Sequence, residues 1–445
     1  MAVTASRGRL APRRPPIPWF NHALRAVCAL YLVVIVVAVI TYKTIFIEMV
    51  VEDPYFGVYS VAVCLFILSR FLFSLFYHAA PDPTEPMEPT IAIVMPAFNE
   101  EEAVAGSIRS LLAAEYPAQK LEIVVVNDGS TDGTLREIHA VADASSAVRV
   151  IDFPENRGKR AAMAAGIRST SAEVIAFVDS DSALEPDALR QIVRGFADPR
   201  VGAIAGHADV ENARETWITR MQAVRYFVAF RVCKAAESIF GAVTCCSGCF
   251  SVYRRAAIAP VLERWEGQQF LGRPATYGDD RSLTNFVLRK WKVRYDETAR
   301  SVTIVPAHFR LFLRQQLRWK RSWTRESLII SRFIWHKSPL ASLWVYLGIV
   351  LPLLAPIVAV RAIVWLPLFG GGGAPLIYLI GIYAMALVYG LYYGLKHGRY
   401  DTLWVFGVMF VFFYIAFLLW QTYYAILTSR NSSWGTRGVP TGAAP

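Results

Sequence analysis

Long apolar segments constrain this chain most strongly, because about 20 mostly apolar residues match the ~30 Å hydrocarbon core of a membrane. Two such segments lie near the N-terminus, Ala26–Ile47 and Phe56–Tyr77, and three lie toward the C-terminus, Leu340–Phe369, Ala374–Leu395 and Thr402–Thr428. Only 18% of the residues are charged, against about 25% in soluble domains. The sequence therefore predicts a membrane protein with a soluble insert between two groups of spans.

The charges beside the first spans predict which side of the membrane holds the insert. Residues 1–25 contain five arginines and no acidic residue, and Lys or Arg near a span end stays in the cytoplasm. We therefore expect a basic cytosolic N-terminus at 1–25, two transmembrane helices at 26–80 and a cytosolic domain at 81–305. A signal peptide is the alternative for Ala26–Ile47, but a small-residue cleavage site is missing and a second span follows.

The C-terminal spans give a conflict between their number and the charges that follow them. Three complete spans in 339–428 would place the tail at 429–445 outside, yet Arg430 and Arg437 favour the inside. We therefore expect one segment to be broken or re-entrant. Pro352 and Pro356 make the first a candidate, whereas the basic loop Lys396–Arg399 favours the first two as full spans. The sequence leaves this choice open.

Short β-branched runs alternate with helix-length segments in the insert. The runs Ile91–Met95, Glu122–Asn127 and Glu173–Asp179 are separated by expected helices at Glu101–Ala114 and Thr134–Ala142. This order predicts an α/β fold with a mostly parallel sheet, which binds ligands beyond the carboxyl ends of its strands. The polar residues that follow these three runs at that edge are Asn99 and Glu100, then Asp128, then Asp179 and Asp181.

Two carboxylates after the third run suggest a cation site. Asp179 and Asp181 can present oxygen ligands to a hard cation that also binds a diphosphate. The loop Asn127–Gly133 has a simpler interpretation, as a turn followed by a helix cap. Cys246 and Cys249 have a spacing that occurs in metal and redox sites, but no second pair accompanies them. The convergence of several acids at one edge carries more weight than any single motif.

Three further motifs extend this set: Asn156–Arg160, Tyr277–Arg281 and Gln315–Trp319. Together with the strand ends, they resemble the family-2 processive glycosyltransferases, which have a Rossmann-like GT-A fold and use a nucleotide-sugar donor. The order of spans and insert also matches, so the resemblance covers nearly the whole chain. Gly278–Asn285 and Trp434–Arg437 are most similar to hyaluronan synthases, and the catalytic motifs are also similar to those of chitin-oligomer and cellulose synthases.

The resemblance implies a role for each donor-side residue. Asn99, Glu100 and Asp128 would contact the uridine side of the donor. Asp179 and Asp181 would hold its diphosphate through Mg²⁺ or Mn²⁺, and Lys159 or Arg160 would add positive charge. A solvated surface pair is the simpler interpretation of those two basic residues.

On the acceptor side, the resemblance implies that Asp280 is the catalytic base and that Arg318 offsets the charge of the departing UDP. Trp319 would support the terminal sugar, and Gln315 lies on the same helical face; an interfacial anchor is the alternative for Trp319. Asp279 would support the base, and Arg281 would pair with a carboxylate to fix the loop. The remaining substrate-binding candidates are Ser247, Gly248 and Trp434.

Two amphipathic segments, Thr216–Phe240 and Phe309–Phe333, mix Arg, Trp and Phe at helical spacing. Such helices lie in the membrane interface, and we expect one at 306–338 that carries the Gln315–Trp319 motif. A plain surface helix is the alternative for Thr216–Phe240. These helices would dock the catalytic face on the spans, so that a growing polymer could enter a passage among them.

The resemblance thus implies a membrane-embedded, processive, inverting β-glycosyltransferase of the plasma membrane that polymerises UDP-GlcNAc and UDP-GlcA and exports the product. Its expected partners are UDP-sugar donors, the growing polysaccharide and the lipid bilayer, without nucleic acid or an obligate protein partner. Hyaluronan synthases carry Ser-Gly-Pro-Leu where this chain has Ser247–Phe250, preceded by Cys245 and Cys246. That double cysteine leans toward chitin-oligomer synthases, so a single-donor polymerase is the first alternative. Transfer of one sugar to a lipid carrier and a receptor with a relic transferase domain are more distant alternatives.

Overall fold

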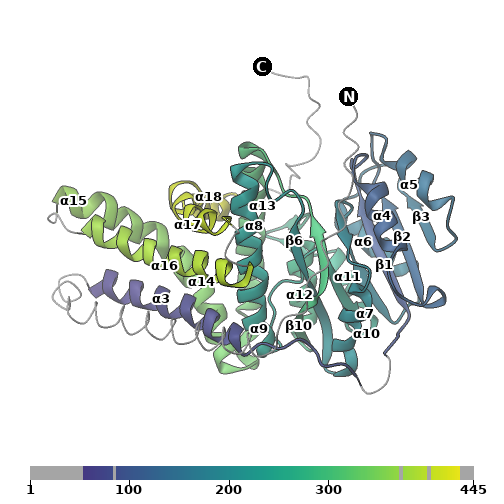
Figure 1. The fold of residues 1–445 in the computed structure, drawn as a ribbon, viewed down its shortest axis with the longest axis horizontal. Helices are drawn as coiled ribbons and strands as arrows, with labels where there is room; N and C mark the ends of the chain where they lie inside the picture. The colour runs from purple at the N-terminus through teal and green to yellow at the C-terminus, as the bar shows by residue number, and fades with distance from the viewer. Residues whose placement is uncertain (1–53, 84–86, 370–373, 398–401, 431–445) are drawn as a thin grey trace.

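The computed structural model describes residues 54–83, 87–369, 374–397 and 402–430. The first predicted span, the basic N-terminus and Trp434 lie outside these residues. Figure 1 shows a sheet with its covering helices on one side, a group of apolar helices on the other, and α8 and α13 between them. The helices α8 (Trp217–Val228) and α13 (Phe309–Ile330) contact elements of both parts.

The central sheet has eight strands in the order β3-β2-β1-β4-β7-β6-β10-β5. The pairs β1–β2, β1–β4, β2–β3 and β6–β10 are parallel, and β7 and β5 pair antiparallel with their neighbours. This arrangement confirms the mostly parallel sheet. The strands are β1 Ile91–Ala97, β2 Leu121–Asn127, β3 Val148–Asp152, β4 Val174–Phe177, β5 Ser182–Leu184, β6 Val201–Val210, β7 Ser251–Arg254 and β10 Lys292–Thr303.

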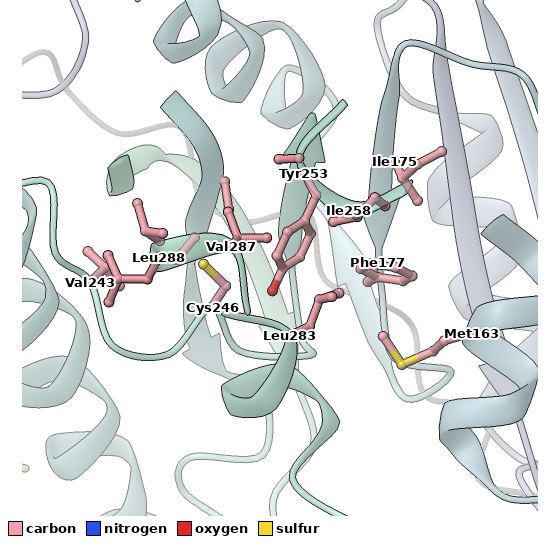
Figure 2. Packing of buried hydrophobic residues seen from close by; sticks show 14 of the residues in the cluster. Met163, Ile175, Phe177, Val243, Cys246, Tyr253, Ile258, Leu283, Val287 and Leu288 are labelled. Carbon is pink, nitrogen blue, oxygen red and sulfur yellow. The ribbon is translucent and has the colours of Figure 1, made fainter. Parts of the chain in front are cut away.

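Both faces of the sheet are buried, which explains why β1 is apolar throughout. Its alternate residues Ile91, Ile93 and Met95 pack on one face, whereas Ala92 and Val94 pack on the other. Figure 2 shows part of the core on the face of Ala92 and Val94, in which side chains from the sheet meet helices α6 (Lys159–Arg168) and α12 (Asp279–Leu288). The covering helices are α4 Val104–Leu112, α5 Thr134–Ala142, α6 Lys159–Arg168, α7 Ala188–Val193, α10 Arg255–Ile258, α11 Leu262–Glu266 and α12 Asp279–Leu288. A short hairpin, β8 Gln269–Phe270 and β9 Arg273–Pro274, precedes α12.

Both predicted amphipathic segments are helical. The first begins with a capping box, in which the Thr216 hydroxyl accepts from the Thr219 N–H at 3.3 Å. It continues as α8, a π-helical turn at Ala229–Lys234 and α9 Ala235–Ile239. α8 packs against β6 and α17 (Trp404–Phe413), and α13 packs against α12 and α18 (Gln421–Leu427). Each helix therefore connects the sheet domain to the apolar helices.

Within the described residues, two helices are long and apolar enough to cross a membrane, Gly57–Leu75 in α3 (Pro54–Leu75) and Pro339–Phe369. A third span results if the pair Trp404–Leu418 and Gln421–Leu427, bent by 45°, crosses as one. The long stretch comprises α14 Pro339–Val360, a π-turn and α15 Leu366–Phe369, and the others are α16 Ala374–His397, α17 Trp404–Phe413 and α18 Gln421–Leu427.

The candidate break at Pro352 and Pro356 is wrong, because both prolines lie inside the continuous helix α14. The hydroxyls of Tyr59 and Tyr423 donate to carbonyls on either side of Pro352, those of Leu351 at 3.2 Å and Leu353 at 2.7 Å, and so tie α14 to neighbouring helices. The sharp bend lies in the third apolar stretch instead.

Candidate active site

Asn99 and Asp128 lie where β1 and β2 end, and each organises a loop. Asn99, which has φ +52°, accepts from the Thr131 N–H at 2.9 Å and donates its backbone N–H to Ser130 Oγ at 3.1 Å. Asp128 is buried, and its Oδ1 accepts from the backbone N–H groups of residues 157 and 158 at 2.7 and 3.2 Å. Burial raises the pKa of Asp128, and these two donors offset part of that rise. The backbone N–H of Glu100 donates to Thr134 Oγ1 at 2.7 Å.

Lys159 connects the donor-side acids. It follows the Gly158 amide that binds Asp128, and its ammonium group pairs with Asp179. Burial lowers the pKa of Lys159, but the Asp179 carboxylate and the charges of Asp279 and Asp280 raise it on balance. Lys159 is therefore a charged group close to both the strand-end acids and the Gly-Asp-Asp turn.

Asp179 and Asp181 could contribute to a cation site. Both carboxylates lie near the Cys249 thiol, whose pKa is raised first by burial and then by these two charges. Among the described residues, no group of three His, Cys, Asp or Glu side chains is placed to hold a metal ion. Two carboxylates fit a hard cation whose other ligands are substrate phosphates.

The Gly278–Asp280 turn places the candidate base at the start of α12. Gly278 has φ +75°, a left-handed conformation, and a Cβ there would lie 1.8 Å from Ser322 Oγ on α13. Asp280 Oδ1 accepts from the Arg281 N–H at 2.8 Å, and Cys245 Sγ lies 3.6 Å from its Oδ2. Burial raises the pKa of the Cys245 thiol to about 12, so the thiol stays protonated and donates to the carboxylate.

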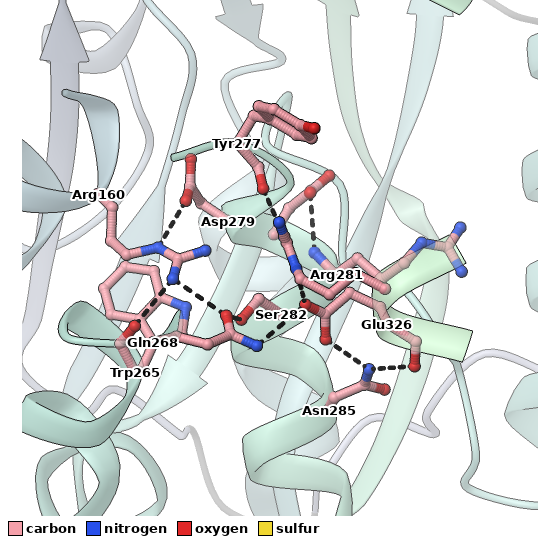
Figure 3. Close-up of polar contacts among 11 residues, drawn as sticks. Arg160, Trp265, Gln268, Tyr277, Asp279, Arg281, Ser282, Asn285 and Glu326 are labelled. Carbon is pink, nitrogen blue, oxygen red and sulfur yellow. Dashed lines mark hydrogen bonds and ion pairs between the residues drawn. The ribbon is translucent and has the colours of Figure 1, made fainter. Parts of the chain in front are cut away.

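Asp279 is not available to substrate, because it is buried in an ion pair with Arg160 (Figure 3). The Arg160 Nε–Asp279 Oδ1 distance is 2.7 Å, and the two side chains are 5% and 4% exposed. Arg160 also donates to the carbonyl of Trp265 at 2.9 Å and to Gln268 Oε1 at 3.0 Å. The alternative that Arg160 faces a phosphate is therefore wrong: its guanidinium holds the turn beneath the base.

A second network joins this turn to α13. Arg325 donates to the Tyr277 carbonyl at 2.6 Å and to Glu326 Oε1 at 2.8 Å. Glu326 also accepts from Gln268 at 3.1 Å and from Asn285 at 2.9 Å (Figure 3). The sequence predicts that Arg281 pairs with a carboxylate to fix the loop, but its side chain forms no ion pair with the residues that the structure describes. Its backbone N–H donates to Asp280 instead.

Ser247 and Gly248 lie in the loop that precedes β7, beside the strand-end acids. A Cβ on Gly248 would lie 2.8 Å from Asp179 Oδ2, so the loop passes directly over that carboxylate. Ser247 Oγ accepts from Lys234 Nζ at 3.0 Å, and Lys234 also lies 3.9 Å from the centre of the Phe230 ring.

Gln315, Arg318 and Trp319 share a face of α13, as expected from their spacing. The Arg225 guanidinium of α8 lies 5.3 Å from the Trp319 ring centre and donates to Gln316 Oε1 at 2.6 Å. The structure thus places Gln316 and Trp319 at the contact between α13 and α8.

A cavity of about 370 Å³ opens beside the candidate base, toward the apolar helices. Cys245 and Arg281 line it on the catalytic side, whereas Phe66 and Arg70 from α3 and Trp344 from α14 line it on the other. The cavity therefore begins next to the residues that flank Asp280 and extends between α3 and α14, two helices long and apolar enough to cross a membrane.

The sequence does not reveal the structural roles of several of these residues. Arg160 follows another basic residue, and its ion pair with Asp279 joins positions 119 residues apart, which no local pattern reveals. Cys245 lies in a loop without periodicity. Glu326 could have been suspected, because it is a lone acid in the basic amphipathic segment Phe309–Phe333.

The chain is similar to known glycosyltransferases in sequence and in structure. Residues 92–262 match the family described as glycosyl transferase family 2. The hyaluronan synthase of Streptococcus pyogenes is 33% identical over 396 residues, which cover 86% of this chain and 90% of that protein. An N-acetylglucosaminyltransferase of Rhizobium meliloti is 35% identical over 264 residues, or 59% of this chain and 62% of that protein.

The mannosyltransferase PcManGT from Pyrobaculum calidifontis, solved with GDP-Man and Mn²⁺, has a similar fold. The TM-score is 0.55 at 20% identity, and the match covers 80% of this chain and 99% of that one. This likeness supports the expected GT-A-like architecture. With a family-2 domain and a hyaluronan synthase relative that matches most of its length, this chain is a glycosyltransferase that belongs to glycosyl transferase family 2.

Proposed function

We propose that this enzyme polymerises UDP-GlcNAc and UDP-GlcA into a hyaluronan-like polysaccharide and moves the product through its own membrane region. The observation that carries the proposal is the cavity between the residues flanking Asp280 and the helices α3 and α14. A single-sugar transferase needs no such space beyond its acceptor. The similarity to a hyaluronan synthase also extends over 86% of the chain, beyond the family-2 domain.

In the proposed reaction, Asp280 takes the proton of an acceptor hydroxyl as its oxygen attacks the anomeric carbon. The bond from that carbon to the diphosphate breaks, UDP leaves, and a single displacement converts an α-linked donor into a β linkage. Lys159 and Arg318 supply positive charge for the leaving diphosphate. Trp319 offers a flat face for the terminal sugar, and Asn99, Glu100 and Asp128 bind the uridine side.

Asp179 and Asp181 would hold Mg²⁺ or Mn²⁺ together with the diphosphate. The bound cation would neutralise negative charge on the leaving group. Lys159 pairs with Asp179, so its ammonium group lies where it would also face the diphosphate of a donor held by these two carboxylates. The enzyme would act in the plasma membrane, with the sheet domain and both chain ends in the cytoplasm.

A single-donor synthase of chitin-like chains is the second candidate. It is favoured by the match to an N-acetylglucosaminyltransferase and by the double cysteine Cys245-Cys246. Both candidates use the same base and the same cavity. They differ in whether the acceptor site must accommodate a second, acidic sugar.

The two candidates are separated by supplying the donors singly and together. We expect the purified protein in lipid nanodiscs with Mg²⁺ or Mn²⁺ to make polymer only when both UDP-GlcNAc and UDP-GlcA are present. The polymer should be digested by hyaluronidase. Polymer made from UDP-GlcNAc alone would contradict the two-donor proposal and support the chitin-like one.

A further inference from the structure

The cavity beside Asp280 contains more basic than acidic side chains. Three basic residues line it, Arg70, Lys234 and Arg281, against two acidic residues, Glu237 and Glu326. Ionisable groups at the level of membrane helices are costly, and they commonly mark a substrate pathway. The partners of these five residues therefore indicate what the cavity is suited to bind.

Both acids already have several partners. Glu237 pairs with Arg70 at 3.0 Å, and its other oxygen accepts from the N–H of Thr244 at 3.0 Å. Glu326 accepts from Arg325, Gln268 and Asn285, as described above. Arg70 is neutralised by Glu237, so the excess positive charge belongs to the other two basic residues.

Lys234 and Arg281 have no carboxylate within ion-pair distance in the part of the chain that the structure describes. Lys234 is only 9% exposed, and its ammonium group donates to the neutral Ser247 hydroxyl. No dashed line reaches the Arg281 guanidinium in Figure 3. Arg281 is half-buried and Lys234 is buried, and removing the Lys234 charge from water without a counter-ion is costly. These two charges therefore favour an anionic ligand at this position.

Asn285 adds an unpartnered acceptor to the same wall. It lies one helical turn after Arg281 on α12 and is 1% exposed. Its Nδ2 donates to the Glu326 carbonyl at 3.2 Å and to Oε2 at 2.9 Å, which fixes the orientation of the amide. Its Oδ1 then has no hydrogen-bond partner, although it is buried. A buried amide oxygen of this kind is satisfied by a donor such as a sugar hydroxyl.

We propose that Arg281, Lys234 and Asn285 form an acceptor subsite for a uronic acid unit of the growing chain, next to the sugar that reacts at Asp280. The guanidinium and ammonium groups bind the carboxylate, because a guanidinium can donate two parallel hydrogen bonds to it. Asn285 Oδ1 accepts from a hydroxyl of the same unit. This subsite rests on the proposed polymerase function, and it gives a physical reason for an acidic rather than a neutral product.

The test compares two matched probes that bind without any donor present. One is a β-linked tetrasaccharide that alternates N-acetylglucosamine and glucuronate, and the other is the same molecule with each carboxylate reduced to an alcohol. Calorimetry on the protein in lipid nanodiscs should give about 10- to 100-fold tighter binding for the charged probe, as expected for charge-assisted hydrogen bonds. The double variant Arg281→Gln/Lys234→Gln should bind both probes equally. Lys290→Gln, exposed just after α12, should keep the wild-type preference.

Equal binding of the two probes by the wild type would overturn the subsite, and so would a preference that survives in the double variant. If the double variant does not fold, the wild-type comparison alone decides. Because no transfer occurs in this assay, its outcome is separate from that of the two-donor experiment. Polymer formation without any probe preference would reject the subsite alone, whereas the absence of transfer from either donor would reject the polymerase function.

Discussion

Asp280→Asn is expected to lower the rate of sugar transfer by at least about 10²-fold, because it removes the general base and preserves the size of the side chain. The asparagine can still accept from the Arg281 N–H, which bonds Asp280 Oδ1 at 2.8 Å. The turn should therefore keep its shape. Affinity for UDP should change little, since the uridine-side candidates Asn99 and Asp128 lie at the ends of other elements. Transfer is measured as UDP release, and UDP affinity by calorimetry.

Asp143→Asn is the matched control for this prediction. Asp143 follows α5 and its side chain is 77% exposed, so the same chemical change there should leave transfer and UDP affinity as in the wild type. Near-normal turnover by Asp280→Asn would show that another group accepts the proton. A parallel loss of UDP affinity would show that Asp280 acts on the donor rather than on the acceptor.

Asp279→Asn is expected to lower the thermal stability of the protein. The effect differs from that of Asp280→Asn, although the two residues are adjacent in the same motif. The substitution leaves the Arg160 guanidinium, 5% exposed, without its ion-pair partner. Breaking a buried pair from one side costs about 3–5 kcal/mol. The melting temperature of the purified protein should therefore fall by on the order of 10 °C, as measured by the fluorescence of its tryptophans on heating.

Glu263→Gln provides the contrast, because it removes one partner of an ion pair that is exposed. The side chains of Arg168 and Glu263 are 42% and 79% exposed, and such surface pairs contribute about 0–1 kcal/mol. The double variant Arg160→Met/Asp279→Leu should recover part of the stability lost in Asp279→Asn, since it removes both charges. Equal melting temperatures for Asp279→Asn and Glu263→Gln would contradict the structural role of the buried pair.

The alternation of strands and helices in the insert could be predicted from the sequence because it depends on local patterns. Helix α5 has the predicted bounds, Thr134–Ala142, and β1 and β2 begin or end within two residues of the predicted runs. The convergence of Asn99, Asp128 and Asp179 follows from the parallel sheet, since carboxyl ends of parallel strands share one edge. Periodicity and topology thus suffice to predict that these polar residues gather at one edge of the sheet.

The ion pairs and hydrogen bonds that hold the Gly278–Asp280 turn could not be predicted from the sequence, because they join segments that are far apart in the chain. Lys159 and Arg160 are adjacent in sequence, yet one pairs with Asp179 and the other with Asp279. Successive residues of a helix point about 100° apart, and only the packing of α6 decides which residue meets which acid. The bend in the last apolar stretch is a similar case, because the prolines that suggested a break lie inside the continuous helix α14, whereas the bend lies just before α18.

Coupling of synthesis to passage through the membrane is tested most directly in sealed proteoliposomes. Vesicles that carry the enzyme with its sheet domain facing outward receive both radiolabelled UDP-sugars, and hyaluronidase is then added outside. We expect most of the labelled polymer to resist digestion until detergent opens the vesicles, because the cavity beside Asp280 extends between α3 and α14, which are apolar enough to cross the membrane. Polymer that is digested as completely before detergent as after it would contradict a passage through this chain.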